Sequence, residues 1–210
     1  MAITPSLCPS GRYTMDWSYG AGAFVSTPSP VGANGFSSWT WAPAILQGVG
    51  PSNAFTVTAS SSYSNATGTP VSLTMRGQTG GTSNSGVTMG QGASNTTNFA
   101  CFTLSFSQTL DNVVFSVGDI DFAGHEQVWI SPIPPPAGIV TGANVVGSGT
   151  AGTPWEGTGG DLNIQTDHSS AVDLTYSSLT TFTLCMHNIT TGWQSNMTIS
   201  SLVFDCPTWV

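Results

Sequence analysis

Hydrophobic and polar residues alternate with a period of two along much of the stretch from Cys101 to Ile130. In the segments 102–106 (FTLSF) and 113–117 (VVFSV), every second residue is apolar and the residues between are mostly polar. This alternation is typical of half-buried β-strands. We therefore expect two strands joined by a short turn at Gln108–Asn112, and a third strand at residues 126–130 (EQVWI) after an acidic loop.

The rest of the chain predicts more short strands between turn-rich loops. They are expected at Phe55–Ser60, Val71–Met75, Val87–Met89, Ile139–Val146, Leu162–Thr166, Val172–Tyr176, Phe182–His187 and Met197–Phe204, with two more within TMDWSYG and FSSWTWA near the N-terminus. No segment has the apolar spacing of an amphipathic helix. Short strands at intervals of roughly 8–12 residues predict an all-β protein, and we expect a single jelly-roll-like antiparallel β-sandwich with long loops rich in Gly, Pro and Ser.

The chain of 210 residues suits one large domain, and no internal repeat or clear linker divides it. We expect a single domain spanning 1–210. Residues 1–54 are an irregular, aromatic-rich segment, and residues 99–206 contain the best-defined part of the sandwich.

The composition excludes several classes of partner. Only 6% of residues are charged, against about 25% in typical soluble domains. Arg12 and Arg76 are the only basic side chains, and the net charge is −8. Binding to nucleic acid or to an anionic membrane requires clustered Lys and Arg, so neither is expected. No apolar run approaches the roughly 18 residues of a transmembrane helix. The segment Met1–Pro5 lacks the features of a secretion signal, so we expect a virion protein released by lysis or a secreted protein whose leader was removed.

The four cysteines predict disulfides, because their number is even and the chain is rich in loops. We prefer Cys8–Cys206, which joins the termini, and Cys101–Cys185, which joins two strands. Both Cys101 and Cys185 fall on the non-aromatic phase of their strands, which makes a cross-strand bridge geometrically feasible. The alternative is four buried free thiols.

Three acidic residues are the best candidates for a metal site. Asp119, Asp121 and Glu126 lie within eight residues of one another near a strand end. No cofactor is predicted, but calcium takes several oxygen ligands from such loops and is the candidate ion for this site. The alternative is that the aspartates accept backbone N–H bonds within the loop. A glycosidase pair of carboxylates is a weaker interpretation, because the spacing of DIDFAGHE matches the jelly-roll glucanases poorly.

Aromatic side chains are the candidate contacts for a glycan or a protein partner: Trp17, Trp39, Trp41 and Trp155. Indole rings stack on sugars, but aromatic rings more often cover a hydrophobic core. The three histidines, His125, His168 and His187, lie in no recognisable zinc or hydrolase motif. No catalytic residue is predicted, and the protein is not expected to be an enzyme.

The second half of the chain resembles a class of bacterial extracellular β-sandwich modules. The stretch FTLSFSQTLDNVVFSVGDID, the strand EQVWI and the closing strand MTISSLVFDC carry the resemblance, which covers residues 99–206. It implies a non-catalytic part of a secreted or surface protein. Leu110 stands where those modules carry Pro-Val, and a proline run follows Ile130.

These observations together predict a non-enzymatic structural protein on an extracellular particle, namely a bacteriophage capsid decoration (cement) protein or tail appendage. We expect capsid or tail proteins as partners and a homo-oligomer, with a virion or extracellular location. The alternative is a secreted carbohydrate-binding or adhesion module.

Overall fold

The computed structural model describes residues 12–15, 37–41, 57–63, 72–76, 86–91, 99–121, 123–130, 135–159, 168–190, 195–200 and 202–205. Only the backbone of the strands before residue 99 is described. The strands are β1 (Arg12–Met15), β2 (Ser37–Trp41), β3 (Val57–Tyr63), β4 (Ser72–Arg76), β5 (Gly86–Gln91), β6 (Phe99–Gly118), β7 (Glu126–Ile130), β8 (Gly138–Thr141), β9 (Val145–Val146), β10 (Glu156–Gly157), β11 (Val172–Asn188), β12 (Ser195–Ile199) and β13 (Leu202–Asp205). A single 3-10 turn at His168–Ser170 is the only helical element in these ranges.

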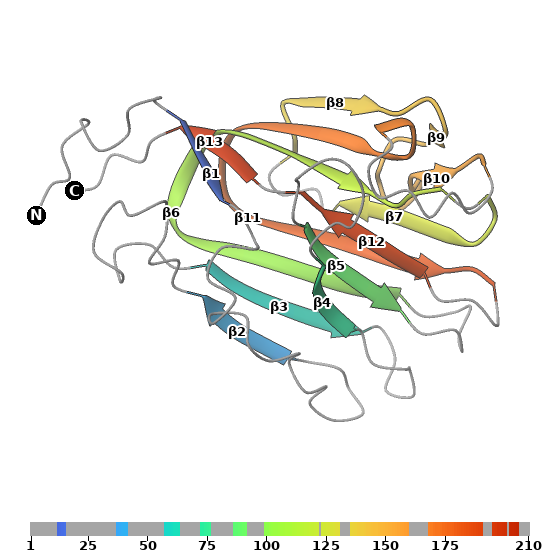
Figure 1. Ribbon diagram of the computed structural model, residues 1–210, viewed down its shortest axis with the longest axis horizontal. Helices are drawn as coiled ribbons and strands as arrows, with labels where there is room; N and C mark the ends of the chain where they lie inside the picture. The colour runs from blue at the N-terminus through green and yellow to red at the C-terminus, as the bar shows by residue number, and fades with distance from the viewer. Residues whose placement is uncertain are drawn as a thin grey trace, which may run out of the picture.

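Two long strands, β6 and β11, organise the fold. They pair antiparallel over almost their whole length, from Phe99 opposite His187 to Val117 opposite Val172. Figure 1 shows both strands bending at the same end of the molecule, beside β1 and β13. A register shift between Leu179 and Thr181 accompanies the bend.

The predicted turn at Gln108–Asn112 is therefore wrong, because β6 runs through it as one strand. The separate strands expected at Val172–Tyr176 and Phe182–His187 are likewise a single strand, β11. The polar residues between the apolar runs mark a shared bend rather than a chain reversal. Asn112, at φ 51°, adopts the left-handed backbone conformation that asparagine tolerates better than most residues.

The bend divides the sheet into two layers. In the first layer, the N-terminal half of β6 lies between β3 and the C-terminal half of β11, with β2 and β7 outside them. In the second layer, the other halves of β6 and β11 are flanked by β8 on one side and by β12 and β13 on the other. β12 continues the sheet through β5 to β4, and β13 pairs with β1.

The core lies between these layers and is built from the apolar phase of each strand. Phe115 and Phe182, from different halves of the long strands, have ring centroids 4.8 Å apart, and Phe115 stacks on Tyr176 at 5.9 Å. The other fully buried side chains include Leu104, Leu110, Val113, Val117, Val128, Leu174, Leu184, Met186, Met197, Ile199 and Phe204. Every pairing among the described strands is antiparallel. The predicted all-β, jelly-roll-like β-sandwich is confirmed.

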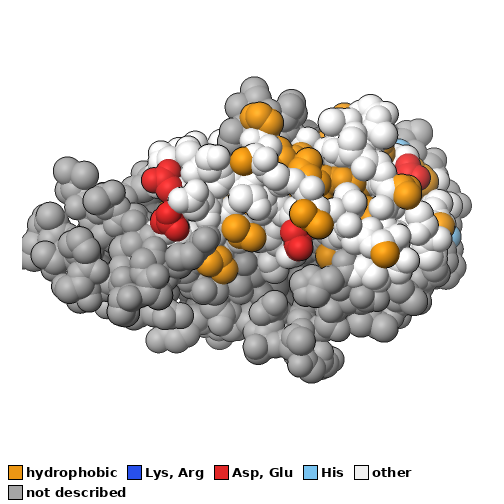
Figure 2. Space-filling model, turned by 90° about the horizontal axis from the view of Figure 1, so that it is seen from above, with side chains coloured by type: hydrophobic (Ala, Val, Ile, Leu, Met, Phe, Trp, Pro, Cys, Tyr) orange, Lys and Arg blue, Asp and Glu red, His pale blue; other side chains and the backbone are white. Residues whose placement is uncertain are grey.

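Smaller differences concern strand ends and loops. The strand expected at Ile139–Val146 is two short strands, β8 and β9, and the closing strand is split into β12 and β13. The strand expected at Leu162–Thr166 lies outside the described residues. The described residues contain no helix with the length and apolar character needed to cross a membrane. Over the described part of the face that Figure 2 presents, apolar side chains are scattered among mostly uncharged polar ones. Among the described residues, Ile139, Val140 and Val146 are exposed apolar side chains.

Candidate functional site

A groove lies against the outer face of the first layer. Its floor is a row of residues that are directly opposite one another on three strands: Trp129 of β7, Cys185 of β11 and Cys101 of β6. Thr183, two residues before Cys185, extends the floor toward the bend. The floor faces away from the core, because Val128 and Leu184, on the opposite phase, are fully buried.

The predicted disulfide between Cys101 and Cys185 is confirmed, with their Cα atoms 4.0 Å apart. The two residues are direct register partners in neighbouring antiparallel strands. The bridge thus fixes β6 to β11 in the middle of the groove floor. The second predicted bridge, Cys8–Cys206, lies outside the described residues.

Two segments form the walls of the groove. One wall contains Pro135, Pro136 and Ile139, and the other is the loop from Ser148 to Ala151. The loop is tied to β7 by a hydrogen bond from the Ile130 N–H to the Gly149 carbonyl, at 3.0 Å. Backbone N–H groups of Thr150 and Thr153 each bond to the other's carbonyl, which closes the loop into a tight hairpin.

The chemistry of the groove is that of a site for an uncharged ligand. It encloses about 550 Å³, within the range of roughly 300–1,000 Å³ that small-molecule sites occupy. Its described lining is mainly apolar, with hydroxyls from Ser148, Thr150 and Thr183, and includes no Asp, Glu, His, Lys or Arg. Apolar walls with a few fixed polar groups are the usual composition of a ligand site.

Paired hydroxyls continue the outer face beyond the floor. Thr183 and Thr103 are opposite one another, with their hydroxyl oxygens 2.8 Å apart. In the next row, the hydroxyl oxygens of Ser105 and Thr181 are 3.1 Å apart. The Thr181 hydroxyl donates to the Leu104 carbonyl at 2.9 Å, so the Ser105 hydroxyl is the donor of that pair.

On the other side of the floor, a polar row crosses the same strands. Gln127 of β7 is opposite His187 of β11, which is opposite Phe99 of β6. The Gln127 amide nitrogen donates to Glu156 Oε1 at 2.5 Å, and the Gln127 Oε1 lies 3.3 Å from His187 Nδ1. The ring of Phe99, 40% exposed, meets the ring of Trp129 edge to face at 5.3 Å. Trp129 therefore belongs both to the groove and to the edge of this row.

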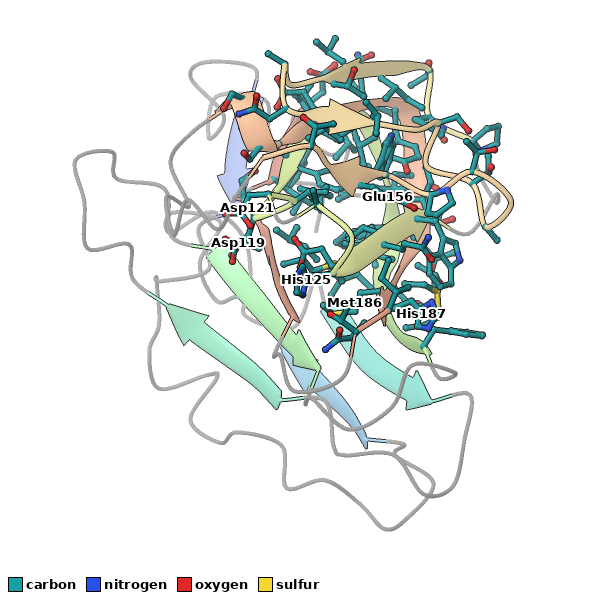
Figure 3. The ribbon with its side chains drawn as sticks, turned by 90° about the vertical axis from the view of Figure 1, so that its right-hand side faces the viewer. Asp119, Asp121, His125, Glu156, Met186 and His187 are labelled. Atoms are coloured by element: carbon teal, nitrogen blue, oxygen red, sulfur yellow. A yellow bond between two sulfur atoms is a disulfide. The ribbon has the colours of Figure 1, made fainter. Side chains whose placement is uncertain are left out.

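The predicted acidic site lies elsewhere. Figure 3 shows Asp119 and Asp121 at the end of β6, apart from Glu156 and His187. Asp119 has a φ of 69°, which interrupts the alternation of the strand, and Ile120 rather than Asp119 enters the core. Asp121 and Glu126 are both buried, and the Asp121 N–H donates to Glu126 Oε1 at 3.2 Å. Within the described ranges no group of three or more His, Cys, Asp or Glu is arranged to hold a metal ion, and calcium remains a prediction.

His125 and His187 have structural partners. His125 Nδ1 lies 2.6 Å from the Thr190 hydroxyl, and its carbonyl accepts the Ile189 N–H at 2.8 Å. These bonds fasten the loop before β7 to the end of β11. The side chain of His168 is not described.

The predicted tryptophan contacts need one correction. Trp155 is fully buried beneath Gly149 and cannot touch a ligand, so its expected surface role is wrong. Trp17 and the side chains of Trp39 and Trp41 on β2 lie outside the described residues. Trp129, which lines the groove, was not among the predicted residues. Its signal in the sequence is its position between Val128 and Ile130, on the phase of β7 that faces solvent.

No family model and no curated protein matches the chain. Among solved structures, it is similar to the adhesin domain of PrgB from Enterococcus faecalis bound to DNA, with 9% identity, a TM-score of 0.36, and coverage of 69% of this chain and 60% of that domain. It is also similar to a family 11 carbohydrate-binding module from Clostridium thermocellum in complex with a mixed-linked tetrasaccharide, with 8% identity, a TM-score of 0.30, and coverage of 92% and 95%. Likenesses with such low scores assign neither a family nor a ligand to this chain.

Proposed function

We propose that this protein is an extracellular binding module that takes a neutral glycan in the groove over the Cys101–Cys185 disulfide. The observation that carries the proposal is the position of Trp129, a partly exposed indole on the floor of a groove whose described lining is free of charge.

The groove offers the two kinds of contact that a sugar needs. Sugars present C–H groups on their flat faces, which pack against aromatic rings such as that of Trp129. Their hydroxyls need hydrogen-bond partners at the edges, which Ser148, Thr150 and Thr183 supply. Ions gain little in this groove, because its described lining contains no charge of opposite sign.

The same lining suits a protein that binds a glycan without cleaving it. Glycosidases use a pair of carboxylates that flank the scissile bond, and the described lining contains none. The disulfide supports a location outside the reducing cytosol, because such bridges persist in oxidising environments.

The proposal is tested with purified protein in its disulfide-bonded form. Isothermal titration with cello-, manno- and xylo-oligosaccharides should show saturable binding to at least one series. Absence of binding to all of them, with the disulfide shown to be intact by mass spectrometry, would reject the proposed ligand class.

The virion role and the homo-oligomer remain predictions from the sequence. A capsid decoration protein or a tail appendage also requires a stable β-sandwich, so the fold does not distinguish that role from a secreted module. Sedimentation analysis of the isolated chain tests the oligomer, and co-sedimentation with phage particles tests the capsid or tail partner.

A further inference from the structure

The polar row beside the groove has hydrogen-bonding groups that the bonds within the row do not use. Glu156, Gln127 and His187 form a chain of hydrogen bonds across β10, β7 and β11, and the ring of Phe99 lies at its end on β6. Figure 3 shows Glu156 and His187 on the side of the molecule that faces the viewer. All three polar side chains are partly exposed, so they reach solvent while they bond to one another.

The bonds fix the orientation of the Gln127 amide. A carboxylate only accepts hydrogen bonds, so the amide nitrogen must point toward Glu156 and the amide oxygen toward His187. The reverse orientation would place two acceptors against each other. It follows that His187 Nδ1 carries the hydrogen of its bond, and that the Gln127 side chain is held rigid from both ends.

This arrangement leaves a donor and an acceptor side by side. The Gln127 amide has a second N–H beyond the one that Glu156 accepts, and the Glu156 carboxylate has a second oxygen. Neither is used in a hydrogen bond within the described part of the chain. A sugar hydroxyl both donates and accepts, so vicinal hydroxyls of one sugar residue match this pair.

The row is also continuous with the groove. Gln127 and Trp129 share the outward phase of β7 and are two residues apart, which corresponds to about 6.8 Å along an antiparallel strand. The exposed ring of Phe99 meets Trp129 edge to face, so an apolar surface connects the groove to the row.

We infer that Glu156, Gln127 and Phe99 form a second subsite, which binds the adjoining residue of a longer neutral oligosaccharide whose first part occupies the groove. This inference rests on the proposed function, and it adds that the second subsite makes the protein prefer longer ligands. Phe99 contacts the apolar face of the sugar, while Gln127 and Glu156 bond to its hydroxyls.

The test compares the binding of short and long oligosaccharides by variants that keep the Gln127 hydrogen bonds of the row. Glu156→Gln keeps an oxygen that can accept the Gln127 N–H, but it replaces the other carboxylate oxygen with a donor. Phe99→Leu keeps an apolar side chain and removes the ring. Asp111→Asn removes the same charge from an exposed residue at the bend of β6, outside both subsites, and serves as the control.

Each variant is titrated with the disaccharide and the hexasaccharide of the cello-, manno- and xylo-series. We expect wild type to bind the hexasaccharide more tightly than the disaccharide of the series it recognises. Glu156→Gln and Phe99→Leu should each weaken hexasaccharide binding by about tenfold, the factor that corresponds to about 1.4 kcal/mol, and leave disaccharide binding unchanged. Asp111→Asn should behave as wild type.

The possible failures are distinct. Wild-type affinity for the hexasaccharide in both row variants would overturn the second subsite and leave the groove proposal standing. Loss of disaccharide binding in the row variants would also overturn it, because the row would then belong to one undivided site. No binding of any saccharide by wild type would overturn both proposals.

Discussion

Gly149 lies directly over the indole ring of Trp155: a Cβ atom added to Gly149 would lie 2.2 Å from Cζ2 of that ring. Gly149 also has a φ of +70°, a backbone conformation that residues other than glycine rarely adopt. The buried Trp155 thus supports one wall of the groove from beneath, and glycine alone allows the loop to approach it.

Gly149→Ala should therefore destabilise the protein by about 2–4 kcal/mol, from the clash with the ring and the positive φ together. Gly152→Ala, in the same loop, is the matched control, because an added Cβ there meets nothing within 4 Å. Chemical denaturation of both variants measures the difference. Equal stability of the two variants would show that Trp155 does not support the loop as described.

Burial of Tyr176 should make the stability of the protein fall at alkaline pH. Its side chain is 1% exposed, its hydroxyl has no hydrogen-bond partner among the described residues, and burial raises its pKa from 10.0 to about 12. The Tyr176 hydroxyl therefore ionises at a lower pH in the unfolded chain than in the folded protein. The stability that depends on its neutral form is complete below pH 10 and is lost as the pH rises toward 12. The loss amounts to about 2–3 kcal/mol over that range.

Tyr176→Phe should remove this part of the alkaline destabilisation. At neutral pH the variant should be as stable as wild type or more stable, because it deletes a buried hydroxyl without a partner. Denaturant midpoints measured from pH 7 to pH 12 provide the comparison. Parallel pH profiles for the two proteins would contradict the account of Tyr176.

Substitutions of the buried residues Asp121 and Glu126 test whether the acidic loop binds calcium. The Glu126 carboxylate accepts the Asp121 N–H, so Glu126→Gln should cost about 1–2 kcal/mol of stability even without a metal. If the loop only makes such bonds, a chelator leaves the melting temperature of wild type unchanged. A chelator-induced decrease that is absent in Asp121→Asn but present in Asp111→Asn would instead establish a calcium site there.

Peptide mapping under non-reducing conditions should recover the Cys101–Cys185 bridge and test the predicted Cys8–Cys206 bridge. The second bridge closes a very long loop, for which the chain-entropy model gives about 4–5 kcal/mol. Alkylation of Cys8 and Cys206 in the native protein would reject it without affecting the first bridge.

The sequence predicted the fold class because strand alternation is a local signal that packing seldom overrides. It also predicted the Cys101–Cys185 bridge, since both residues lie on the polar phase of their strands. It failed at Gln108–Asn112, where polar residues typical of a turn occupy a bend within β6. A bend and a reversal use similar residues, and only the long-range pairing with β11 distinguishes them.

The candidate site was harder to predict. The groove requires residues from β6, β7, β11 and two loops, and their proximity follows from register rather than from any motif. Trp155 was predicted as a surface contact on its residue type alone, yet Gly149 lets the loop cover its ring. Trp129 could have been found from its solvent-facing phase in β7, which is an unusual position for a tryptophan.

The most direct test of the proposed function is calorimetric titration of wild type, Trp129→Ala and Val140→Ala with the neutral oligosaccharide that wild type binds best. Val140 is 67% exposed and lies outside the groove, so its variant controls for the loss of an exposed apolar side chain. The account predicts that Trp129→Ala weakens binding at least tenfold, a loss of about 1.4 kcal/mol or more, while Val140→Ala binds as wild type does. Unchanged affinity in a folded, disulfide-bonded Trp129→Ala variant would contradict the proposal that the groove is the glycan site.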